Sequence, residues 1–92
     1  MAARLQALSE PKNQKAHLLR DMIKGRMIAE QDYRYNRFRG NISDLRNDYA
    51  LPVRFHDEAF TNSFGKNSHY RRHYIMTKDR EQAIEVYKKI NK

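Results

Sequence analysis

The apolar residues between Lys15 and Lys24 recur at the spacing of an amphipathic helix: they are Ala16, Leu19, Met22 and Ile23. A stripe of this kind predicts a helix that packs one side on a core. Ser9 and Asn13 both have side chains suited to cap its start, and Gly25 offers a C-terminal stop. We therefore predict a first helix that begins after one of these caps and ends before Gly25.

Two further segments predict helices. Ala29 to Tyr35 fits a compact second helix, because Glu30 and Asp32 in its first turn favour the positive end of the helix dipole. The preceding pair Met27-Ile28 fits either a short strand or the lead into that helix. The last segment carries an apolar stripe of Ala83, Ile84, Tyr87 and Ile90, with Thr77, or Asp79 together with Gln82, as its cap.

The stretch Arg37–Asn47 has two different faces at helical pitch. Phe38, Ile42 and Leu45 form one narrow apolar stripe. The opposite side carries small or amide-bearing residues, namely Asn36, Gly40, Ser43 and Asn47. Side chains of this kind, flanked by arginines, are able to contact base edges and phosphates. We predict a helix that ends near Tyr49, before the bend imposed by Pro52.

The pattern after Pro52 changes from helical to extended. Val53 to Phe55 alternates apolar and polar residues, and Tyr70 to Met76 is a longer run of residues that favour strands. These two runs predict a β-hairpin. Between them, His56 to His69 would form a long loop, and loops of that length are usually functional or mobile.

Length and composition restrict the class of protein. The 92 residues allow one domain with a single small core, and the absence of cysteine excludes disulfides and zinc fingers. No apolar run is long enough for a membrane span or a signal peptide, so we expect a cytoplasmic protein, in the host cytoplasm or associated with the nucleoid. Nineteen basic against eleven acidic residues give a net charge of +8. This excess favours nucleic acid as a partner, and a charge needed only for solubility is the alternative.

The order of the predicted elements favours an α+β fold of the winged helix-turn-helix type. In addition, Arg37 to Arg46 resembles the recognition-helix signature of small phage-type winged helix-turn-helix DNA-binding proteins: Arg, an apolar residue, three variable residues, then Ile-Ser-Asp-Leu-Arg. The resemblance implies a three-helix core, a two-stranded hairpin wing over residues 56–73 and a C-terminal helix. Residues 1–12 would be a flexible arm and residues 13–92 the winged helix domain.

Within this resemblance, DNA contacts are expected from the helix and from the wing. The candidates on the helix are Asn36, Arg37, Arg39, Asn41, Ser43, Arg46 and Asn47. Those on the wing are Lys66, Asn67, Arg71 and Arg72. Asn and Arg pair bidentately with adenine and guanine in the major groove, and the wing residues suit phosphates or the minor groove. As an alternative to DNA contact, Asp44 and Arg46 could have a structural role, such as an intramolecular ion pair. The alternative for the wing is a solvated basic face.

Other functions find little support in the sequence. His69 and His73 are too far apart in a strand for a metal pair, and no cluster around Ser43-Asp44 or Asp57-Glu58 suggests catalysis. We expect no enzyme, cofactor, metal or membrane partner. The function predicted is a regulatory protein that binds double-stranded DNA. The alternative is an interaction module for a host transcription, replication or defence protein, and a homodimer formed through Leu5 and Leu8 or the last helix is also open.

Overall fold

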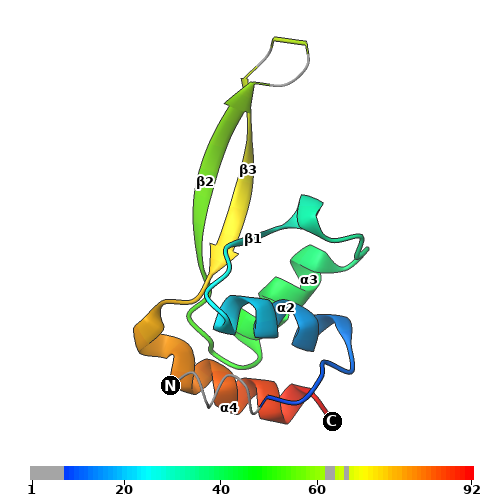
Figure 1. The fold of residues 1–92 in the computed structure, drawn as a ribbon, viewed down its shortest axis with the longest axis vertical. Coiled ribbons are helices and arrows are strands. Elements are labelled where there is room, and N and C mark those ends of the chain that lie inside the picture. The colour runs from blue at the N-terminus through cyan, green and yellow to red at the C-terminus, as the bar shows by residue number, and fades with distance from the viewer. Residues whose placement is uncertain (1–7, 62–63, 66) are drawn as a thin grey trace.

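The computed structural model describes residues 8–61, 64–65 and 67–92, which form three α-helices and three strands. In chain order these are α2 (Gln14–Ile23), β1 (Ile28–Ala29), α3 (Phe38–Asn47), β2 (Arg54–Thr61), β3 (Asn67–Tyr74) and α4 (Arg80–Ile90), with single 3₁₀ turns at Glu30–Asp32 (η1) and Thr77–Asp79 (η2). Figure 1 shows the three helices gathered at one end of the molecule and the β2–β3 hairpin extending away from them. The fold is α+β, as predicted.

The start and the end of α2 follow from local chemistry. Asn13 is extended and its Oδ1 accepts a hydrogen bond of 2.8 Å from the backbone N–H of Ala16, which makes it the N-cap. Gly25 has a φ of +91°, a conformation that glycine adopts without a steric penalty. The prediction for this helix is confirmed, with Asn13 rather than Ser9 as its cap.

The prediction of a second helix at Ala29 to Tyr35 is wrong. Ile28 and Ala29 pair with β3, and only one 3₁₀ turn follows. The Asp32 carboxylate accepts a hydrogen bond of 3.1 Å from the Ala29 N–H, so it closes this single turn instead of starting a helix. Tyr33 is extended, and its hydroxyl donates to the buried Asp21 at 2.5 Å, which ties the segment to α2. The helical core therefore consists of α2, α3 and α4.

The hairpin is longer than predicted. Strands β2 and β3 pair from Arg54 opposite Tyr74 to Thr61 opposite Asn67, so most of the expected loop between His56 and His69 is strand. Its residues carry no simple apolar alternation because much of the hairpin extends beyond the core (Figure 1). The open question at Met27-Ile28 is also answered, since Ile28 starts a short third strand in the antiparallel order β1-β3-β2.

The apolar sides of all three helices meet in one core. Phe38, Leu45 and Tyr87 are among its largest fully buried side chains, and Ile28 and Val53 close it from the sheet side. The apolar side of α4, with Ala83, Ile84 and Tyr87, is buried within the chain. Asp79 is the N-cap residue of α4, as one of the two predicted alternatives has it, although its side chain makes no cap hydrogen bond. The other alternative, Thr77, is wrong because Thr77 begins η2.

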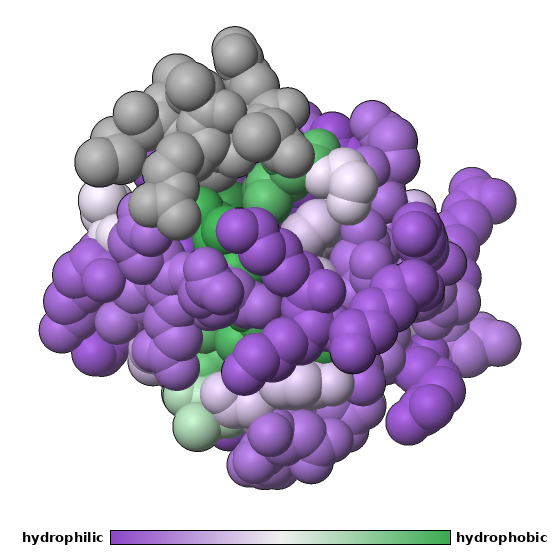
Figure 2. All heavy atoms as spheres, turned by 90° about the horizontal axis from the view of Figure 1, so that it is seen from below, coloured by the Kyte–Doolittle hydropathy of each residue, from purple (hydrophilic) through white to green (hydrophobic). Residues whose placement is uncertain are grey.

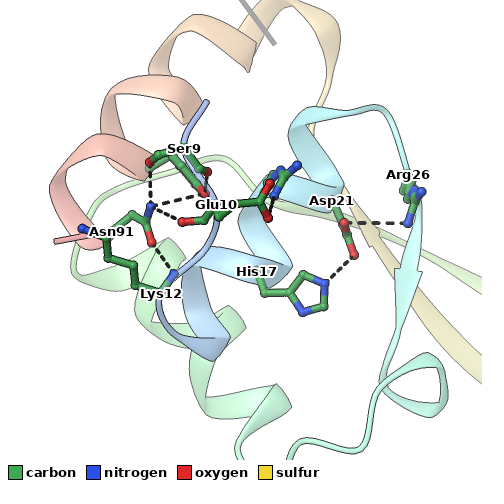
Figure 3. Close-up of polar contacts among 9 residues, drawn as sticks. Ser9, Glu10, Lys12, His17, Asp21, Arg26 and Asn91 are labelled. Atoms are coloured by element: carbon green, nitrogen blue, oxygen red, sulfur yellow. Dashed lines mark hydrogen bonds and ion pairs between the residues drawn. The ribbon is translucent and has the colours of Figure 1, made fainter. Parts of the chain in front are cut away.

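Residues 8–12 are attached to the end of α4 (Figure 3). The side-chain oxygen of Asn91 accepts from the Lys12 backbone N–H at 2.6 Å, and its Nδ2 donates to Ser9 Oγ and to the Glu10 carbonyl, both at 2.9 Å. Leu8 packs against the core. The part of the predicted flexible arm that the structure describes is therefore bound to the domain, while residues 1–7, including Leu5, lie outside the described residues. Within the described part of the chain, no helix has the length and apolar content to cross a membrane.

Candidate nucleic-acid interface

Helix α3 presents one buried and one exposed face, as the sequence predicted. Phe38, Ile42 and Leu45 are buried in the core, whereas Arg39, Ser43 and Asn47 are exposed. The Asn47 Nδ2 donates to Ser43 Oγ at 3.0 Å, which aligns these two side chains along the helix surface. The exposed face of α3 thus combines one arginine with small polar groups.

Asn41 is a correction to the predicted set. Its side chain is only 6% exposed, and its Nδ2 has no hydrogen-bond partner in the described residues. Asn41 lies three residues after Phe38 and four before Leu45, so the helix places it on the core side. Asn41 therefore does not belong to the surface of α3 that could contact a base.

A groove of about 750 Å³ separates α3 from the hairpin, and we call it the α3–hairpin groove. It is lined by Glu30 and Gln31 of η1, by Phe38, Arg39, Ile42, Ser43 and Arg46 of α3, and by Asp57, Tyr70, Arg71 and His73 of the hairpin. Three of the predicted DNA-contacting arginines, on α3 and on β3, therefore border one cavity. This shared cavity could not be predicted from the sequence, because α3 and β3 are distant in the chain and meet only in the folded structure.

Arg46 lines this groove and is held in place by two contacts. Its Nε donates to the Val53 carbonyl at 3.0 Å, and its guanidinium lies 5.7 Å from the centre of the Phe55 ring. Asp44 pairs instead with Lys15 of α2 at 2.9 Å. Asp44 and Arg46 therefore do not pair with each other, but each makes an intramolecular contact with another residue.

Two other groove arginines contact acidic residues. The Nε of Arg39 is 3.2 Å from an oxygen of Glu30, and both side chains are exposed. Arg71 approaches Asp57 with two nitrogens, at 2.9 and 3.5 Å, and its guanidinium lies 3.9 Å from the centre of the Phe55 ring. Asp57 and Arg71 face each other across the strands. The sequence would have predicted this pair if the register of the hairpin had been known, because Asp57 and Arg71 are opposite each other in it.

Arg72 lies on the other face of the hairpin, because neighbouring side chains in a strand point to opposite sides. Its guanidinium donates to Glu58 at 2.5 Å, to the Tyr70 hydroxyl at 3.0 Å and to the Met27 carbonyl at 3.1 Å. The Glu58 hydrogen bond raises the pKa of Arg72, and the same contact lowers the pKa of Glu58. Arg72 is not among the residues that line the groove and instead ties the hairpin to the segment around β1.

The remaining candidates lie at the two ends of the interface. Asn36 is exposed in the turn before α3, and the Arg37 guanidinium lies beside Gly40. Arg34 is also exposed there and makes no ion pair within the described residues, a group that the resemblance did not indicate. Lys66 lies outside the described residues, and Asn67 occupies the strand position opposite Thr61.

His73 is buried at the wall of the groove, with 9% of its surface exposed and its ring centre 5.8 Å from that of Phe38. Burial and the nearby charges of Arg46 and Arg71 lower its pKa from 6.5 to about 4 in the folded chain, against a smaller opposing effect of Asp57. The ring is therefore neutral at pH 7. Below pH 6.5 the unfolded chain binds a proton that the folded chain does not accept until about pH 4.

We expect the stability of the protein to fall as the pH is lowered from 6.5 to 4, with up to about 3 kcal/mol of the loss due to His73. Urea unfolding at several pH values measures this, with His73→Leu as the test and the exposed His56→Leu as the matched control on the same hairpin. The slope between pH 4 and 6.5 should become shallower only in His73→Leu. Equal slopes in the two variants would contradict the assignment.

Comparisons with known proteins identify no relative of this chain. No protein-family model, no curated protein and no solved structure matches the chain. The candidate function therefore rests on the residues and the geometry of the α3–hairpin groove.

Proposed function

We propose that this chain is a DNA-binding regulatory protein with a winged-helix arrangement, in which α3 enters the major groove and the β2–β3 hairpin acts as the wing. The observation that carries the proposal is the convergence of Arg39, Arg46 and Arg71 on one groove beside the exposed face of α3. Guanidinium groups bind phosphates bidentately, and they also read guanine edges. The net charge of +8 adds attraction for a polyanion.

The shape of the exposed face supports contact with bases. Gly40 and Ser43 are small, so the backbone of α3 can approach base edges closely, and the Asn47 amide is available at the same surface. An α-helix fits the major groove of B-DNA. In the proposed complex, Arg71 on the hairpin side binds the phosphate backbone, and Arg39 and Asn47 contact bases.

The opposite end of the molecule has a different surface. α4 lies at the end of the fold away from the hairpin, and its exposed side chains carry both signs of charge, with Glu81 and Glu85 beside Lys88 and Lys89 (Figure 1). Seen from that end, most of the surface is hydrophilic, with a limited area of apolar atoms (Figure 2). Mixed charges of this kind favour a solvated face over a binding site for a polyanion. This end therefore provides matched control positions.

Selection of bound duplexes from a random DNA pool tests the proposal. We expect an enriched sequence, and we expect Arg39→Ala to weaken binding to it by about 10- to 100-fold, the effect of one lost bidentate base contact. Lys89→Ala removes the same charge from α4 and should change the affinity by less than about threefold. Fluorescence anisotropy at two salt concentrations measures both variants, and Asn47→Ala tests base reading without a change of charge.

Two outcomes would overturn the proposal. One is that no duplex is retained at about 100 mM salt. The other is that Arg39→Ala and Lys89→Ala weaken binding equally, which would reduce the interaction to net charge. In either case the exposed face of α3 would be assigned to a protein partner, and capture from a host lysate with wild type and Arg39→Ala would identify it.

A further inference from the structure

Two carboxylates occupy the α3–hairpin groove beside its arginines. Glu30 comes from η1 and Asp57 from β2, so they reach the groove from two different elements. Each lies within ion-pair distance of an arginine of the groove, at 3.2 Å from Arg39 and 2.9 Å from Arg71. A surface that binds phosphates thus carries its own acidic groups next to two of its three arginines.

These two ion pairs differ from the Arg72–Glu58 pair on the other face of the hairpin. Arg72 donates to Glu58, to a hydroxyl and to a backbone carbonyl, and its side chain is only 27% exposed. By contrast, the side chains of Arg39 and Arg71 are 86% and 51% exposed. Ion pairs between exposed side chains contribute little to stability, because water and salt screen them. The two groove pairs are therefore weak enough to exchange partners.

Carboxylate and phosphate oxygens compete for the same guanidinium nitrogens. Asp57 contacts two nitrogens of Arg71, which is the arrangement that a phosphate also adopts with arginine. A phosphate that enters the groove has to replace this carboxylate or meet its repulsion. Arg46 is different, because its Nε donates to a backbone carbonyl and, within the described residues, it makes no ion pair that would have to break.

We propose that Glu30 and Asp57 are internal counterions of the α3–hairpin groove, which duplex DNA displaces from Arg39 and Arg71. This inference rests on the proposed function. Every duplex, cognate or not, has to displace the two carboxylates from the groove arginines. The two acidic residues therefore weaken binding to all DNA, so that a duplex needs its base contacts with α3 in order to be retained.

The test compares three variants that each remove one negative charge. Glu30→Gln and Asp57→Asn neutralise the groove acids, and Glu85→Gln neutralises an acid that pairs with Lys88 on α4, at the far end of the fold. The dissociation constant of each is measured by anisotropy on a non-cognate duplex and on the selected sequence. We expect each groove variant to bind the non-cognate duplex about three- to fivefold more tightly than Glu85→Gln does.

The selected sequence should gain affinity by a similar factor, because both duplexes displace the same two carboxylates. Equal effects of all three substitutions would overturn the inference, since net charge would then explain them. Weaker binding by Glu30→Gln or Asp57→Asn would also overturn it, because the acids would then serve to position the arginines. If the wild type binds no duplex, the proposed function fails and the inference with it, whereas binding with equal responses contradicts the inference alone.

Discussion

Replacing Phe38 by alanine is expected to lower the free energy of unfolding by about 3–5 kcal/mol, as found for buried aromatic residues in general. Phe38 is 1% exposed, and its ring centre lies 5.8 Å from those of both Tyr33 and His73. It therefore joins the first turn of α3 to the sheet and to the segment that follows η1. Its loss leaves a cavity where three parts of the fold meet.

Urea unfolding followed by circular dichroism measures this effect, with Phe55→Ala as the matched control. Phe55 is 47% exposed on the hairpin, so its truncation should cost about 1 kcal/mol. Because Phe38 also borders the α3–hairpin groove, Phe38→Ala should weaken DNA binding even at temperatures where the variant is folded. A loss of stability no larger than that of Phe55→Ala would contradict this role of Phe38.

The second large effect is expected at Asn91. Its buried side chain accepts from Lys12 and donates to Ser9 and Glu10, so Asn91→Ala leaves backbone and hydroxyl groups near the chain terminus without their partners. We expect a loss of about 2–3 kcal/mol, from several hydrogen bonds at about 1 kcal/mol each with partial recovery by water. Residues 8–12 should then separate from α4 in a fraction of the molecules.

Hydrogen exchange at the Lys12 amide reports this local change, because that N–H donates directly to Asn91. Asn47→Ala is the control, since Asn47 is exposed and its amide donates only to Ser43 in the described residues. It should cost less than about 0.5 kcal/mol. Unchanged protection of the Lys12 amide in Asn91→Ala would show that other contacts hold residues 8–12.

The helices were predicted best where the determinants lie within one turn of the chain. Asn13 and Gly25 bound α2 through a cap and a positive φ, both of which depend on residues close in sequence. The stripe of Phe38, Ile42 and Leu45 identified the buried face of α3 for the same reason. The prediction for Asn41 fails because it rests on the chemistry of the amide alone, whereas the spacing from Phe38 and Leu45 places Asn41 on the core side.

Segments whose structure depends on distant residues were predicted poorly. Ala29 pairs with Arg72, and Tyr33 bonds to Asp21, so a segment with acidic residues suited to a helix start became a strand, a single turn and an extended connection. The sequence predicts a loop between His56 and His69, where the structure has mostly strand, because polar residues occupy both faces of this part of the hairpin. Only the cross-strand pairing of residues such as Asp57 and Arg71 reveals it.

The sequence by itself determined the three helices α2, α3 and α4, the basic character of the chain and most of the arginines that border the candidate interface, because composition and helical spacing are local properties. Tertiary structure alone decided which of these arginines share a cavity, that Arg72 lies on the other face of the hairpin, and that Glu30 and Asp57 lie beside the groove arginines. The physical reason is that these contacts join residues 9 to 45 positions apart, whose approach is fixed by the packing of α3 and the sheet on one core.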